Sequence, residues 1–128
     1  MHTVRDAYRN WFTKYHHYTS HQKFLLDLSA ANQNHSCLFT VGQSFEKRNI
    51  QGIHIWGALG PGKKAAVIFH GTAHGREWIS TMVTEYLAYQ LLASYGKDKE
   101  ITTSLDNFDF YILPIVNPDG NPPSPPEP

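Results

Sequence analysis

The segment 70–78 holds residue types that bind metal ions. His74 and Glu77 lie three residues apart within it, with Arg76 between them. An imidazole nitrogen and a carboxylate are both good Zn²⁺ ligands, and a spacing of three places two side chains on the same side of one helical turn. The pair therefore predicts a shared zinc ion, held by His74 and Glu77.

The elements on either side of this pair are predicted by their hydrophobic patterns. Residues 65–69 form a short, continuous apolar run, which is typical of a strand buried on both faces. After Trp78, apolar residues recur at helical spacing to about Ser94, and Gly96 is well placed to end the helix. The pair thus lies between the carboxyl end of a strand and the start of a helix, where open α/β sheets bind ligands.

Further elements follow from similar patterns. Ser20 is expected to cap a helix that runs to about residue 33. Strands are expected at 38–41 and 51–56, joined as a β-hairpin by residues 42–49, and residues 57–64 form a flexible link. Residues 97–100 are interpreted as a solvated loop and residues 101–105 as one helical turn.

A last apolar run, 108–116, predicts a strand parallel to 65–69, joined to it by a right-handed crossover. This arrangement brings Asn117 and Asp119 to the same edge of the sheet as the metal loop. The tight turn that they form is expected to shape the site and not to take part in chemistry.

Four other histidines are possible ligands. His70 could complete a local set with His74 and Glu77, but the favoured interpretation is that it ends its strand and hydrogen-bonds nearby backbone. His17 and His21 could form a second metal site, although a partly exposed aromatic patch over residues 1–19 is favoured. His54 is expected to be a surface or interlayer residue.

The string His74-Gly75-Arg76-Glu77-Trp78, followed by Asn117-Pro118-Asp119-Gly120, resembles the zinc metallocarboxypeptidases of the carboxypeptidase A/B type. The resemblance takes in the turn at 41–48, the strand at 52–55 and the helix at 85–87, and covers roughly residues 15 to 120.

The resemblance implies a three-layer α/β/α domain, with a mixed sheet that contains an antiparallel hairpin and a parallel βαβ unit. It implies that His74 and Glu77 are the first two zinc ligands, and that Arg76 contacts the substrate peptide near the scissile bond. The implied activity is zinc-dependent release of C-terminal amino acids from peptides and proteins.

The same resemblance implies that the third zinc ligand, the glutamate general base and further substrate-binding residues come after the Asn-Pro-Asp-Gly turn. Residues 20–120 are therefore interpreted as an incomplete catalytic domain, preceded by an aromatic and histidine-rich segment at 1–19 and followed by a proline-rich, disordered tail at 121–128. Alone, this chain is expected to be inactive. The alternative is a non-catalytic product that at most binds zinc or a protein partner.

Composition limits the partners. The chain has 128 residues, of which 41% are hydrophobic, and its 11 basic residues equal its 11 acidic ones, so neither nucleic acid nor an anionic membrane is expected to bind. A monomer is expected. No signal peptide is visible, and an extracellular location is implied only by the resemblance. Cys37 is the single cysteine, and Asn34-His35-Ser36 is an N-glycosylation sequon that is usable only in the secretory pathway.

Overall fold

The computed structural model describes residue 8 and residues 10–62, 64–72 and 78–120. Its elements, in chain order, are α2 (Tyr18–Ala30), β1 (Ser36–Gln43), β2 (Asn49–Ile55), β3 (Ala65–His70), α3 (Trp78–Ser94), α4 (Lys99–Asn107), β4 (Phe108–Leu113) and the 3₁₀ helix η1 (Pro118–Gly120).

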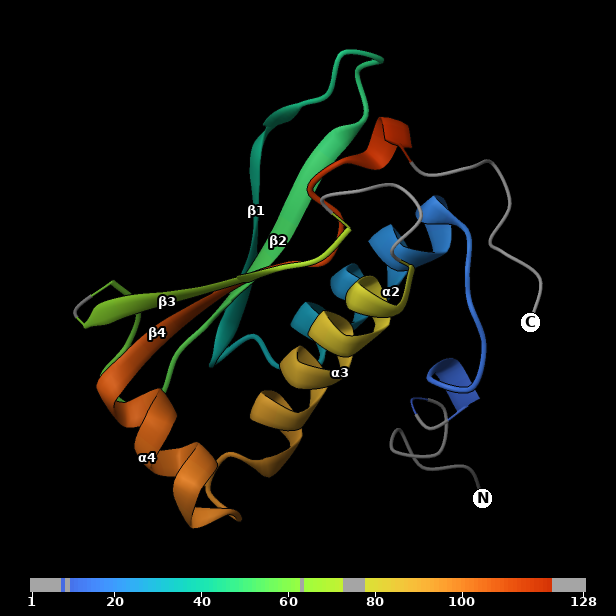
Figure 1. The fold of residues 1–128 in the computed structure, drawn as a ribbon. Helices are drawn as coiled ribbons and strands as arrows, with labels where there is room; N and C mark the ends of the chain where they lie inside the picture. The colour runs from blue at the N-terminus through green and yellow to red at the C-terminus, as the bar shows by residue number, and fades with distance from the viewer. Residues whose placement is uncertain (1–7, 9, 63, 73–77, 121–128) are drawn as a thin grey trace.

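The strands form one mixed sheet in the order β1-β2-β4-β3 (Figure 1). β1 pairs antiparallel with β2, β2 pairs antiparallel with β4, and β4 pairs parallel with β3. The predicted antiparallel hairpin and parallel βαβ unit are therefore confirmed. β4 lies between β2 and β3, although it follows both of them in the chain.

The core lies between the sheet and the helices α2, α3 and α4. It is formed by buried apolar side chains of all three helices and of the two central strands: Phe24, Leu25, Leu28, Ile53, Ile55, Ala88, Leu91, Leu92, Leu105, Phe110 and Ile112. Ile53 and Ile55 of β2 reach it together because alternate residues of a strand point to the same face.

The prediction that the strand at 65–69 is buried on both faces is wrong. The strand forms where expected, as β3, but it is the outer strand of the sheet, and Ile68 and Phe69 are 64% and 41% exposed. The apolar run correctly indicated a strand. A strand is buried on both faces only when other elements cover its outer face and its open edge. The described part of the chain leaves both uncovered at β3.

Helix α2 differs from its prediction at both ends. It begins at Tyr18, with His17 as the N-cap residue and no side-chain cap, and it ends at Ala30. Ser20 therefore lies within the helix, where its backbone N–H donates to the His17 carbonyl oxygen at 3.0 Å. The first turn of α2 thus includes Tyr18, whose hydroxyl accepts a hydrogen bond from Gln22 one turn later at 3.1 Å.

Helix α3 has the bounds that were predicted, Trp78–Ser94, and Gly96 follows it with a φ of 82°. The helix after it is longer than the single turn expected. Asp98 caps α4 by accepting a hydrogen bond from the backbone N–H of Ile101 at 3.0 Å, so the charged residues 97–100 include a cap and a first turn and are not a loop.

The strands also differ from prediction in length. β1 and β2 extend beyond the predicted 38–41 and 51–56 at one or both ends, and β4 ends at Leu113, before the apolar residues Ile115 and Val116. The backbone ladder nevertheless continues past β4, because the Val116 N–H donates to the Gly71 carbonyl at 3.1 Å.

The described aromatic residues near the N-terminus are partly exposed and lie against the helices. Trp11 stacks on Phe24 with ring centroids 4.8 Å apart, and Phe12 meets Tyr86 edge to face at 5.1 Å. These half-buried rings cover part of the surface shared by α2 and α3. None of the helices in the described ranges has the length and apolar character needed to span a membrane.

Candidate functional site

The predicted zinc ligands His74 and Glu77, and the predicted substrate residue Arg76, fall outside the described residues. Both flanks of the segment that carries them are described. β3 ends at His70 and α3 begins at Trp78, so the segment joins the carboxyl end of a strand to a helix N-terminus, as predicted. Imidazole and carboxylate are the donor types that zinc prefers at such a site.

Gly71, the residue after β3, is hydrogen-bonded to the chain at and after the end of β4. Its N–H donates to the Leu113 carbonyl at 2.8 Å, and its own carbonyl accepts from Val116. A Cβ atom at Gly71 would lie 2.7 Å from the carbonyl oxygens of both Pro114 and Ser80, which is closer than real Cβ contacts. Only glycine therefore lets these three backbone segments meet.

Thr72, the next residue, is hydrogen-bonded to the first turn of α3. It is 1% exposed and has a φ of 52°, in the left-handed region that side chains with a branched Cβ rarely adopt. Its N–H donates to Ser80 Oγ at 2.7 Å, and its hydroxyl contacts the hydroxyl of Thr81. Thr81 in turn donates to the Pro114 carbonyl at 2.9 Å. Thr72 and the first turn of α3, which flank residues 73–77 in the chain, are thus joined by buried and partly buried hydrogen bonds.

The turn that follows β4 is fastened to the β1–β2 hairpin. Asp119 accepts hydrogen bonds from Ser44 Oγ at 2.6 Å and from the Glu46 N–H at 2.9 Å, and Arg48 Nη1 lies 2.9 Å from the same carboxylate. The Ser44 hydrogen bond, and then the Glu46 and Arg48 contacts, hold the pKa of Asp119 below its ordinary value despite an opposing effect of desolvation. These contacts fit the shaping role expected for this turn, whereas the predicted proximity of Asn117 and Asp119 to the metal loop remains a prediction.

His70 is the last residue of β3, is exposed, and pairs in register with Leu113. It therefore ends its strand, as the favoured interpretation holds. That His70 does not bind metal stays a prediction.

His21 does not lie in an exposed patch. It is 2% exposed, and its Nδ1 lies 2.7 Å from Glu85 Oε2, while Trp11 Nε1 donates to Glu85 Oε1 at 3.1 Å. Burial raises the pKa of Glu85, and the contacts with His21 and Trp11 offset part of that effect. In the described ranges no three His, Cys, Asp or Glu side chains gather closely enough to hold a metal ion.

Sequence reasoning missed this buried acid. Glu85 lies on the same side of α3 as the buried residues Met82, Ala88 and Leu92, at intervals of three or four. A charged residue within a buried helical stripe was a usable signal that a polar partner lies opposite.

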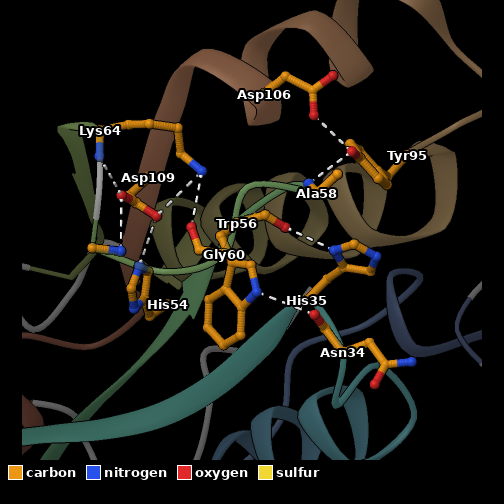
Figure 2. Close-up of polar contacts among 11 residues, drawn as sticks. Asn34, His35, His54, Trp56, Ala58, Gly60, Lys64, Tyr95, Asp106 and Asp109 are labelled. Carbon is orange, nitrogen blue, oxygen red and sulfur yellow. Dashed lines mark hydrogen bonds and ion pairs between the residues drawn. The ribbon is translucent and has the colours of Figure 1, made fainter.

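A second polar cluster lies at the other end of the sheet, where β3 and β4 begin (Figure 2). Asp109 is 1% exposed and accepts from His54 Nε2 at 3.1 Å and from the backbone N–H groups of Gly62 and Lys64 at 3.2 and 3.3 Å. His54 is accordingly a buried residue of the sheet, 8% exposed. The cluster fixes the link at 57–64, predicted to be flexible, to the start of β4.

The fold and the hydrogen bonds of Gly71 and Thr72 define an α/β protein with a candidate ligand site at the carboxyl edge of a parallel strand pair. The crystal structure of thrombin activatable fibrinolysis inhibitor is similar over 86% of this chain and 27% of its own, with a TM-score of 0.79 and 26% identity. The zinc carboxypeptidase family profile matches residues 21–122. The chain belongs to the zinc carboxypeptidase family.

Two curated members of that family are similar to this chain. Metallocarboxypeptidase A of Trichophyton tonsurans is 52% identical over 111 residues, which are 87% of this chain and 26% of the relative. The inactive metallocarboxypeptidase ECM14 of Paracoccidioides lutzii is 38% identical over 95 residues, 73% of this chain and 16% of the relative. The chain thus spans about a quarter or less of the length of these relatives.

Proposed function

We propose that this chain supplies the first two zinc ligands of a metallocarboxypeptidase, which releases C-terminal amino acids from peptides and proteins. His74 and Glu77 would hold the zinc, and Arg76 would contact the substrate near the scissile bond. The proposal is carried by one observation: the family profile covers residues 21–122, which include His74, Arg76 and Glu77.

Zinc bound at such a site would lower the pKa of a water molecule to about 7 and so supply a hydroxide nucleophile at neutral pH. The residues of this chain would contribute positioning. Thr72 is anchored by a hydrogen bond and α3 begins at Trp78, so the chain between them would have fixed end points. Fixed end points would lower the entropy that is lost when two ligands converge on one ion. We propose a monomeric, extracellular enzyme.

In this proposal the 128 residues would supply two of the zinc ligands and no general base. We therefore expect the purified chain to bind zinc weakly and to release a terminal aromatic or aliphatic residue from a blocked dipeptide no faster than background. Zinc-dependent release by the purified chain would contradict this expectation.

A chimera tests the peptidase proposal directly. The matching segment of the Trichophyton tonsurans relative would be replaced by residues of this chain, and zinc content and dipeptide hydrolysis would be measured. We expect an active chimera that loses more than about 100-fold in activity, together with its zinc, on His74→Ala or Glu77→Gln, since even residues that only support zinc ligands cost 10- to 100-fold. His70→Ala is the matched control and should retain both. A chimera in which His74→Ala keeps its zinc would refute the ligand assignment.

One observation favours the alternative, a non-catalytic product that binds a protein partner. Besides the open edge of β3, the apolar residues Ile79, Val83 and Tyr86 lie along one side of α3 and are each at least 50% exposed. Exposed apolar surface of this kind is typical of a binding face. If the chimera folds, binds zinc and remains inactive while its parent is active, the alternative is favoured.

A further inference from the structure

The sequence contains seven asparagines, and only Asn34 begins an Asn-x-Ser/Thr triplet, here Asn34-His35-Ser36. Such triplets arise often by chance, so the folded structure decides whether a glycan at this one can be accommodated. An asparagine that carries a glycan must lie at the surface with its carboxamide free of contacts with the fold, and the glycan must fit there without covering the functional site.

Asn34 meets the first condition. It is exposed, in the turn between α2 and β1, and among the described residues its carboxamide makes no hydrogen bond. Its backbone is fixed, because its carbonyl oxygen accepts from Trp56 Nε1 at 3.1 Å. Figure 2 shows the carboxamide directed away from the Trp56 indole. A large group attached there would displace no contact of the fold.

The turn also lies at the end of the sheet opposite to the carboxyl ends of β3 and β4. Ser36 pairs with Ile55 at the end of β2, and Ile55 pairs with Phe110 near the start of β4. The segment 73–77 follows the opposite end, where the parallel strands β3 and β4 finish. A glycan on Asn34 would therefore leave the carboxyl edge of the sheet open to a peptide.

We propose that Asn34 is an N-glycosylation site, an inference that rests on the proposed extracellular route. The Asn34 amide nitrogen would attack C1 of an oligosaccharide carried on a lipid diphosphate. A nitrogen–carbon bond forms, the bond from C1 to the diphosphate oxygen breaks, the lipid diphosphate leaves, and the amide loses one proton to a base of the transferase.

Ser36 adds a condition on timing. Its side chain supplies the hydroxyl that the triplet requires, yet in the folded chain Ser36 is 4% exposed and its Oγ donates to the Asn32 carbonyl at 2.8 Å. Once β1 has formed, that hydroxyl is inaccessible to a transferase. Modification therefore precedes folding of the α2–β1 turn.

The test uses the full chain fused to a eukaryotic secretion signal and to a C-terminal tag that carries its own sequon. The tag reports entry into the secretory lumen, so neither native routing nor peptidase activity affects the result. We expect wild type to show two endoglycosidase-sensitive mobility steps in cell lysates, and Asn34→Gln and Ser36→Ala to show one. Gln33→Ala, an exposed change in the same turn, should keep two.

Reading lysates before secretion keeps the test valid if a variant fails to fold. A wild-type chain with only the tag glycan, or an Asn34→Gln variant that retains both steps, would overturn the proposal. Timing is checked with purified oligosaccharyltransferase: a peptide of residues 30–40 should accept the oligosaccharide and the folded, unmodified chain should not. Equal modification of both would overturn the requirement for transfer before folding.

Discussion

Replacing Asp109 by asparagine should be among the most destabilising isosteric changes in this chain. The carboxylate accepts hydrogen bonds from His54 and from the backbone of Gly62 and Lys64, and the Lys64 ammonium lies 3.9 Å away with its side chain 8% exposed (Figure 2). A carboxamide keeps the shape but has one acceptor oxygen, so at least one donor would face an NH₂ group.

The expected loss combines two effects. A buried donor left without an acceptor costs about 1–3 kcal/mol, and removing one member of a buried charged pair costs about 3–5 kcal/mol. Because asparagine keeps one acceptor and the Lys64 ammonium still donates to the Gly60 carbonyl at 3.1 Å, we expect about 3 kcal/mol for Asp109→Asn. Urea unfolding followed by tryptophan fluorescence would measure it.

Asp27→Asn is the matched control. Asp27 lies 2.6 Å from Lys23, but the side chains are 52% and 73% exposed, and such surface pairs contribute less than about 1 kcal/mol. If the two variants lose equal stability, or if Asp109→Asn lies within about 0.5 kcal/mol of wild type, the argument from burial is refuted.

The same variant has a defined pH dependence. Burial alone would raise the pKa of Asp109, but the hydrogen bonds from His54, Lys64 and Gly62 and the Lys64 charge lower it below the ordinary 3.8. A carboxyl group with a lowered folded-state pKa stabilises the fold above its unfolded pKa, and that stabilisation is lost as pH falls through the folded value. The difference between wild type and Asp109→Asn should therefore be full at pH 7 and shrink below the ordinary pKa.

Three further predictions follow from other contacts. Gly71→Ala should cost about 1–3 kcal/mol in urea unfolding, because the new methyl group meets the carbonyl oxygens of Pro114 and Ser80; wild-type stability would contradict the close approach. Glu85→Gln should gain stability relative to wild type as pH rises above 4.5, the ordinary pKa of a glutamate side chain. Burial raises the pKa of Glu85 and disfavours its charged form, so wild type loses stability over that range. A relative gain of the variant on acidification would contradict this reasoning. The open edge of β3 should make the isolated 128-residue chain self-associate, unlike the proposed monomeric enzyme, and Ile68→Lys at that edge should reduce the self-association seen in sedimentation velocity. Self-association that the substitution leaves unchanged would exclude that edge.

The local elements could largely be predicted from the sequence. The bounds of α3 follow from apolar residues at helical spacing and from Gly96, and the hairpin follows from two short strands separated by turn residues. Metal binding by His74 and Glu77 was also predicted from residue type and spacing. It remains a prediction, because those residues lie outside the described ranges.

Tertiary structure alone decided the rest. The insertion of β4 between β2 and β3 leaves β3 at the edge, and no pattern within β3 encodes which strands lie beside it. The pairing of Glu85 with His21 joins residues that are 64 positions apart, and that of His54 with Asp109 joins residues 55 apart. Periodicity and capping act over one or two turns, whereas burial of a polar group is settled only when distant elements pack and supply its partner.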